Sequence, residues 1–227
     1  MQNPSPLPKN FFVHKDIEQA ECLPAEAFRS NDLLCLEREK LFKNAWLMLP
    51  EPSRDSYADD PRSTTQRVIE PDSHAPLDLD GKPLFLKRDK KDVLRLLPNV
   101  CSHAWYPLVT EPGKGKILVC GQHGRRFDNQ GQYLSQPSFA NLPNFPRACD
   151  HLNSLPLHSF GPWLFATLGK PEHEFETIFK PIRESTARMD INSWPRRLQE
   201  VEERIVPGNW KQHAWNFMDK FHIPFIH

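Results

Sequence analysis

The stretch 101-CSHAWYPLVTEPGKGKILVCGQH-123 decides how this chain folds, because it holds two cysteines and two histidines in the order C-x-H-x16-C-x2-H. Each cysteine is followed by a histidine two or three residues later, so each pair fits on one loop. Lys116–Val119, between the pairs, is apolar enough to form a strand that separates the two loops. Thiolates and imidazoles at such spacings are metal ligands. The pattern therefore predicts a zinc site or a mixed-ligand iron–sulfur cluster.

The arrangement resembles the Rieske family more than a zinc site. Zinc fingers usually group cysteine with cysteine and histidine with histidine, whereas each loop here mixes the two. The flanking residues Pro98-Asn99-Val100 and Gly124 also agree with the family. The resemblance implies a [2Fe–2S] cluster whose ligands are Cys101, His103, Cys120 and His123. Two neutral imidazoles in place of thiolates raise the reduction potential of such a cluster.

Departures from the family pattern narrow the subtype. The Rieske proteins of respiratory cytochrome bc complexes carry a disulfide between the two loops, at positions where this chain has Tyr106 and Gln122. Oxygenases and soluble ferredoxins remain. Oxygenases usually have Arg-Gly after the first histidine and tryptophan two residues after the second, where this chain has Ala104-Trp105 and Arg125. These changes surround the ligands and bear on the potential and the docking surface, not on the ligand set.

A second group of ligand-type residues lies in the tail 209-NWKQHAWNFMDKFHIPFIH-227. Asp219 and His222 are three residues apart on an expected helix and should share a face. We expect Pro224 to end that helix and let His227 turn back toward His222. Two histidines and a carboxylate are the ligand set of non-haem Fe(II) oxygenases. Taken alone, however, the pattern is more often ordinary packing.

The tail is similar to the mononuclear-iron motif of Rieske non-haem iron oxygenases. Its Asn216, Asp219, His222 and His227 match that motif position by position. The resemblance implies that His222 and His227 bind the iron. It also implies that Asp219 is a catalytic residue linking the iron site to the Rieske histidine of a neighbouring subunit. Segment 33–46 resembles the opening helix of the family.

The family's third iron ligand, an Asp or Glu, lies downstream of the region where this sequence stops. We therefore expect the N-terminal part of an oxygenase α-subunit, with an incomplete mononuclear site.

Composition sets broad limits on the function. The 227 residues carry a formal net charge of zero, so no overall charge favours nucleic acid or an anionic membrane. The N-terminus lacks a secretory signal, and no apolar run approaches the roughly 18 residues of a membrane-spanning helix. Five widely spaced cysteines do not form a disulfide framework and favour a reducing compartment, by default the cytoplasm. Cys22, Cys35 and Cys149 are interpreted as idle thiols.

The predicted fold class is α+β, an antiparallel Rieske-type β-sandwich followed by the truncated start of a helix-plus-sheet catalytic domain. The expected domains are an N-terminal helical segment at 1–50, a Rieske domain at 51–170 and the beginning of the mononuclear-iron domain at 171–227. Apolar periodicity predicts helices at 31–46, 172–185 and 209–222. Strands are expected at 82–88, 93–97, 116–120, 126–133 with a turn at 129–131 that breaks it, 157–160, 163–168 and 197–206. Segments 1–9 and 51–73 look weakly structured.

The resemblance implies a terminal oxygenase component that passes electrons from the cluster to Fe(II). The iron would activate O2 to hydroxylate or demethylate a small organic substrate. The implied partners are a ferredoxin or flavin reductase as electron donor and, at full length, two further copies in a homotrimer. Lys and Arg residues near Arg125-Arg126 could dock an acidic ferredoxin or simply form a solvated loop. The alternatives are a non-catalytic Rieske electron-transfer protein or inactive fragment, and a zinc-binding module.

Overall fold

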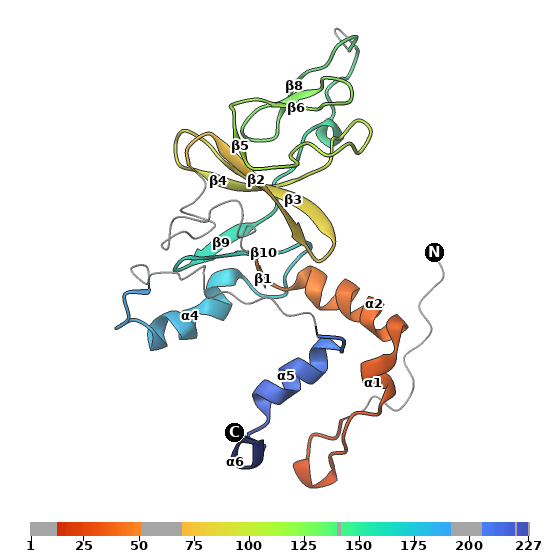
Figure 1. Cartoon of the computed structure of the whole chain (residues 1–227), viewed down its shortest axis with the longest axis vertical. Helices are drawn as coiled ribbons and strands as arrows, with labels where there is room; N and C mark the ends of the chain where they lie inside the picture. Colours follow the sequence, from red (N-terminus) through yellow and green to blue (C-terminus); the bar gives the residue numbers. More distant parts are fainter. Residues whose placement is uncertain (1–12, 51–69, 140–141, 192–205, 221, 227) are drawn as a thin grey trace. The chain divides into compact units, whose positions relative to one another are not determined.

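The computed structural model describes residues 13–50, 70–139, 142–191, 206–220 and 222–226. The chain divides into two compact units. One comprises Asn44–Val201, and the other combines Met1–Lys43 with Glu202–His227. Figure 1 shows the elements of both units, coloured along the sequence. None of the helices in the described ranges has the length and apolar character that a membrane crossing requires.

The unit Asn44–Val201 is built from three small antiparallel sheets. The largest has the strand order β4-β3-β2-β5. Its strands are β2 (Ser73–Leu79), β3 (Lys82–Arg88), β4 (Leu94–Pro98) and β5 (Gly113–Lys114). The second sheet contains β6 (Leu118–Val119), β7 (Arg126–Phe127) and β8 (Tyr133–Ser135). The third contains β1 (Leu47–Met48), β10 (Trp163–Ala166) and β9 (Leu157–Phe160).

The hairpin between β2 and β3 follows from local chemistry. Asp80 and Gly81 form a two-residue connection, and both have positive φ, at 51° and 74°. An Asp-Gly pair accepts this backbone because Gly has no Cβ and Asp tolerates the left-handed region. Our sequence reading did not predict β2, although this turn signal was present.

Strand β3 separates two apolar cores because alternate side chains of a strand point to opposite faces. Leu84 and Leu86 enter a core formed with residues of β2, β4 and β10. Phe85 points the other way, into a core that also contains Cys101 and Cys120. The predicted ligand cysteines therefore lie in an apolar core to which strand β3 contributes Phe85.

Helix α4 (Phe175–Ser185) covers an aromatic cluster of the same unit. Phe175 and Phe179 are buried, and their rings stack with centroids 4.1 Å apart. Ile178 and Ile182, whose spacing from Phe175 would place them on the same apolar face, are each 41% exposed. The helix therefore buries a narrower stripe than its periodicity predicts.

The other unit packs the start of the chain against its tail. Its helices are η1 (Ile17–Gln19), α1 (Glu26–Arg29), α2 (Asn31–Lys40), α5 (Trp210–Met218) and α6 (Ile223–Ile226). Glu37 of α2 is buried, and it accepts hydrogen bonds from Trp210 Nε1 at 2.9 Å and Lys211 Nζ at 2.6 Å. Phe28 stacks on Trp215. Together these contacts tie α1 and α2 to α5.

Two expectations about the tail are wrong, and one is not tested. The helix predicted at 209–222 ends at Met218, because Asp219 has extended backbone and caps it. Pro224 lies in the first turn of α6, where a missing N–H is tolerated, and does not end α5. Most of the strand predicted at 197–206 lies outside the described residues.

Candidate metal centre

The two predicted ligand loops have the same backbone pattern. In the first, Trp105 N–H donates to Cys101 O at 2.9 Å and Cys101 N–H donates to Tyr106 O at 2.8 Å. In the second, Gly124 N–H donates to Cys120 O at 2.9 Å and Cys120 N–H donates to Arg125 O at 2.8 Å. Each turn also has positive φ at the fourth residue after its cysteine, 54° at Trp105 and 67° at Gly124. The loops are therefore two copies of one ligand-presenting turn.

The two cysteines are buried and adjacent. Cys101 is 1% exposed and Cys120 is 2% exposed. Burial raises the pKa of the Cys101 thiol because a thiolate is poorly solvated there, and contact with the Cys120 side chain raises it further. Two thiolates at this place therefore require a bound cation to compensate their charge.

The two histidines lie outside the sulfur pair. His103 and His123 are exposed, and their rings meet edge to face with centroids 4.8 Å apart. The donors thus divide into a buried thiol pair and an exposed imidazole pair, which fits a two-iron cluster with a different ligand type on each iron. Within the described ranges, no three His, Cys, Asp or Glu side chains are grouped to hold a single metal ion.

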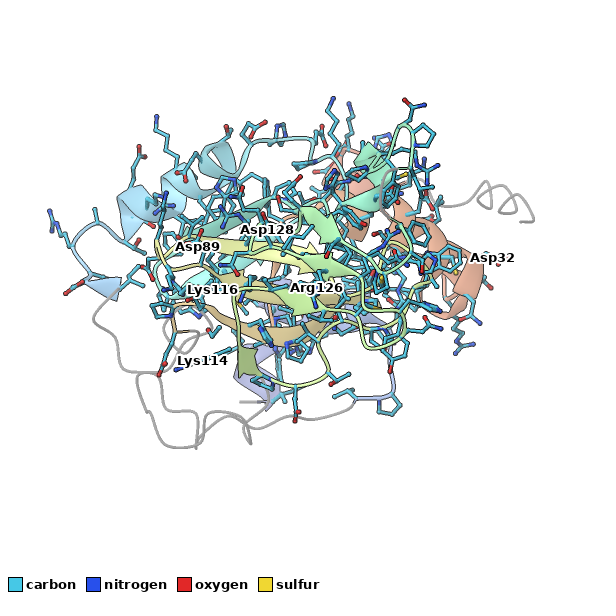
Figure 2. The ribbon with its side chains drawn as sticks, turned by 90° about the horizontal axis from the view of Figure 1, so that it is seen from above. Asp32, Asp89, Lys114, Lys116, Arg126 and Asp128 are labelled. Carbon is cyan, nitrogen blue, oxygen red and sulfur yellow. The ribbon has the colours of Figure 1, made fainter. Side chains whose placement is uncertain are left out.

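Arg125 corrects our sequence interpretation. We had placed it with Arg126 as a docking or solvated residue, but only Arg126, labelled in Figure 2, is exposed. Arg125 is 2% exposed, and its guanidinium donates to Gln136, Ser102 and Asp150. Burial opposes ionisation of Asp150, but hydrogen bonds from Arg147 and Arg125 hold the pKa of that carboxyl below its usual value.

A hollow of about 590 Å³ opens beside His103. Arg125, Phe139, Phe145 and Arg147 are among the residues that line it. On the first loop, the Trp105 side chain is 81% exposed. For Trp105, both the positive φ and the exposure of the indole to solvent cost free energy. A partner protein that covered the indole would offset this cost.

In the tail, the structure brings together two of the three predicted residues. His222 Nδ1 lies 3.2 Å from Asp219 Oδ2, although the two residues do not share a helix as we expected. The contact forms because the chain bends after α5. His227 lies outside the described residues.

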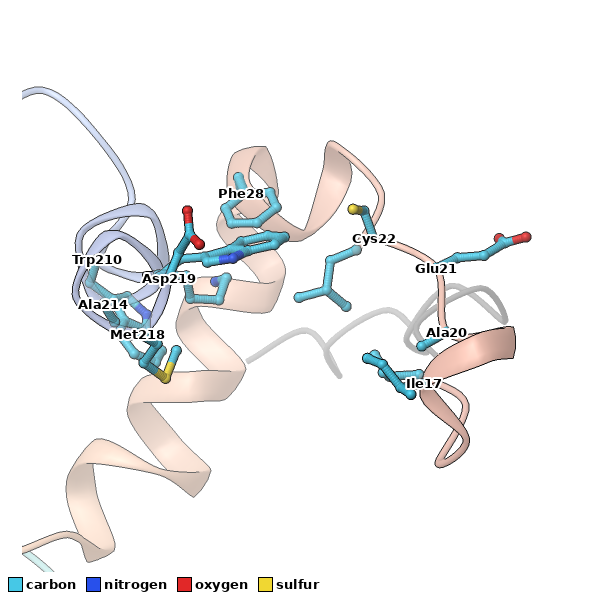
Figure 3. A pocket seen from close by; sticks show the side chains of 13 residues that line it. Ile17, Ala20, Glu21, Cys22, Phe28, Trp210, Ala214, Met218 and Asp219 are labelled. Carbon is cyan, nitrogen blue, oxygen red and sulfur yellow. The ribbon is translucent and has the colours of Figure 1, made fainter. Parts of the chain in front are cut away.

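A pocket of about 610 Å³, which we did not predict from the sequence, lies in the same unit. Figure 3 shows Phe28 and Asp219 on one side of it, and Ile17 and Ala20 on the other. The indole rings of Trp210 and Trp215 also line it.

Comparison with known families tests these assignments. A sequence model described as the Rieske [2Fe–2S] domain matches residues 63–146, a range that includes both loops. The chain carries a Rieske domain. This match sets the zinc alternative aside.

Relatives extend the likeness beyond the Rieske domain. The chain is 23% identical to the carnitine monooxygenase oxygenase subunit of Escherichia coli strain K12, over 100% of this chain and 58% of that protein. It is also 23% identical to the 2-halobenzoate 1,2-dioxygenase large subunit of Burkholderia cepacia, over 98% of this chain and 44% of that protein. The chain thus spans about half the length of such relatives.

Solved structures show the same fold. A quaternary ammonium Rieske monooxygenase superposes with a TM-score of 0.70 at 19% identity, over 92% of this chain and 55% of that one. Naphthalene 1,2-dioxygenase superposes with a TM-score of 0.59 at 21% identity, over 86% of this chain and 42% of that one. The predicted α+β fold, with an antiparallel Rieske domain, is confirmed.

Proposed function

We propose that this chain is the electron-entry part of a terminal Rieske oxygenase. The observation that carries the proposal is the pair of matched loops, which place two buried thiols beneath two exposed imidazoles. We assign Cys101, His103, Cys120 and His123 as ligands of a [2Fe–2S] cluster. Such a cluster, when bound, takes up and passes on single electrons.

The protein residues have distinct tasks in this assignment. The apolar core around Phe85 keeps water from Cys101 and Cys120. The exposed rings of His103 and His123 are placed to hydrogen-bond a partner, which gives electrons a short route across the interface. Exposed Trp105 lies beside them on the first loop and fits a docking role.

We further propose His222 and His227 as ligands of a mononuclear Fe(II), with Asp219 as a catalytic residue beside them. The Asp219–His222 contact supports this, because a carboxylate that accepts a hydrogen bond from an imidazole orients the ring for a metal. The bound iron would supply O2 activation for hydroxylation or demethylation of a small organic molecule. The relatives, which are monooxygenases and dioxygenases by name, favour this reading over a non-catalytic electron carrier.

The partners follow from the same assignment. A ferredoxin or flavin reductase would deliver electrons. Three copies of the full-length protein would form a homotrimer in which Asp219 of one copy approaches the cluster of the next. We place the protein in the cytoplasm, where the free thiols of Cys22, Cys35 and Cys149 would remain reduced.

Anaerobic reduction followed by visible absorption and EPR tests the cluster, together with iron and acid-labile sulfide analysis. We expect two irons and two sulfides from the cluster per chain. His103→Ala and Cys120→Ser should abolish the cluster spectrum, whereas His222→Ala should preserve it. A colourless, sulfide-free protein with one zinc would refute the cluster assignment, and bleaching by His222→Ala would refute the separation of the two sites.

Oxygen uptake by the full-length, cluster-loaded protein with a reductase tests the oxygenase activity. Carnitine, putrescine and 2-halobenzoate, the compounds named in the relatives, form the first substrate panel. We expect substrate-dependent oxygen uptake that His222→Ala removes while the cluster remains. A cluster-loaded protein that is reduced rapidly but never consumes oxygen would support the electron-carrier alternative.

A further inference from the structure

Arg125 links the two proposed cluster loops through side-chain hydrogen bonds. It lies on the second loop, two residues after His123, and its NH1 donates to Ser102 Oγ on the first loop at 2.9 Å. Ser102 stands between Cys101 and His103 in the sequence. Its hydroxyl also donates to Asp150 O at 2.7 Å, so that the Ser102 side chain is held from two sides.

A second path leads from Arg125 to the first histidine. Arg125 Nε donates to Gln136 Oε1 at 2.6 Å, and Gln136 Nε2 lies 3.3 Å from His103 Nδ1. The amide of Gln136 therefore connects a permanent cation to a proposed ligand ring. Truncation of Arg125 would remove one of the two hydrogen bonds that hold Ser102 and the hydrogen bond that holds the Gln136 amide oxygen.

The guanidinium is enclosed as well as bonded. Its carbon lies 5.3 Å from the ring centroid of Tyr133, 5.9 Å from that of Phe139 and 5.7 Å from that of Phe145. Asp150 Oδ1 at 3.3 Å is its charged partner. Charges in such a dry setting are screened weakly and act strongly on their neighbours.

We infer that Arg125 is a positioning residue that clamps the two cluster loops together and raises the reduction potential of the cluster. The inference rests on the proposed cluster site. The clamp occupies the role that an inter-loop disulfide has in the respiratory subtype, since Tyr106 and Gln122 cannot form one. A fixed positive charge near the cluster favours the reduced form, because reduction adds an electron.

Three variants of the cluster-loaded protein separate the clamp from the charge. Arg125→Gln removes both, and Arg125→Lys keeps the charge with fewer donors. Ser102→Ala keeps the charge but removes the hydroxyl that joins the loops, together with its hydrogen bond to Asp150 O. Arg126→Gln is the matched control, because it removes the same charge from the neighbouring, exposed position. The measurements are the midpoint potential, the EPR line shape and the rate of cluster loss to a chelator.

We expect Arg125→Gln to lower the midpoint potential and speed cluster loss about tenfold, the loss expected for one charge-assisted hydrogen bond. Arg125→Lys should recover most of the potential, Ser102→Ala should speed cluster loss with a nearly unchanged potential, and Arg126→Gln should match the wild type. If Arg125→Gln does not fold, Arg125→Lys and Ser102→Ala decide between the outcomes.

Cluster loss at the wild-type rate in both Ser102→Ala and Arg125→Lys would overturn the clamp. An equal potential in Arg125→Gln and wild type would overturn the effect of the charge. A wild-type protein without iron and sulfide would instead refute the proposed cluster site itself.

Discussion

Gly131 offers a quantitative test of how tightly the core beneath the proposed cluster is packed. It lies in the turn between β7 and β8 with φ +82°. A Cβ added there would press directly on Leu152 O and would lie 2.9 Å from Leu152 Cβ and 3.0 Å from Leu97 Cδ2. Gly131 O also accepts a hydrogen bond from Leu152 N–H at 2.7 Å, so the two segments cannot separate freely.

Gly81 is the matched control, because its φ is +74° but a Cβ there would meet nothing within 4 Å. Gly81→Ala should cost about 1 kcal/mol, the strain of an alanine in the left-handed region. Gly131→Ala should add about 2 kcal/mol for overpacking, which gives a total of about 3 kcal/mol. Because Leu97 and Leu152 pack with Cys101 and Cys120, only Gly131→Ala should also speed cluster loss.

Urea unfolding of the two variants, followed by tryptophan fluorescence, measures these losses. The reasoning requires Gly131→Ala to lose clearly more unfolding free energy than Gly81→Ala. Equal losses would show that the segment around Leu152 yields to a methyl group at little cost, and would refute the packing argument.

Two further predictions concern buried charge. Burial, with a smaller contribution from the positive charge of Lys87, lowers the pKa of His74 from 6.5 to about 4. Between these values the unfolded chain binds more protons, so stability should fall as pH falls from 6.5 toward 4. Between pH 7.5 and 5.5 we expect the free energy of unfolding to fall by about 1 kcal/mol from this residue, after allowance for its partial exposure. Urea unfolding of His74→Gln at the two pH values should show a correspondingly smaller fall. Glu37→Ala leaves the Lys211 ammonium buried without its carboxylate and should cost about 3 kcal/mol in thermal or urea unfolding; a loss below about 1 kcal/mol would show that solvent reaches Lys211 easily.

Much of the β structure could be predicted because local pattern and tertiary packing agree there. Strands β3 and β9 have the predicted ends, and each is bounded by a turn that its own residues specify. Helix α2 begins at the predicted Asn31, where Ser30 Oγ accepts from Leu33 N–H. The predicted helix ran on to residue 46, but α2 ends at Lys40.

The errors occur where local pattern and tertiary context disagree. The apolar periodicity of the tail runs past Met218, yet the backbone turns at Asp219. Strand β2 contains His74, Pro76 and Asp78, which are not typical strand residues, but it pairs with β3 from His74 to Leu79. Hydrogen bonds to a neighbouring strand outweigh weak intrinsic preference there.

The order and spacing of Cys101, His103, Cys120 and His123 were enough to predict a Rieske domain from the sequence alone. Ligand chemistry restricts which residue types can bind the cluster, and a short loop restricts their spacing. Both the residue types and the spacing can therefore be recognised in the sequence. The role of Arg125 could not be predicted from the sequence, because its partners Ser102, Gln136 and Asp150 lie 11 to 25 residues away along the chain. Whether a charged residue is solvated or buried depends on what packs around it, and only the tertiary structure decides that.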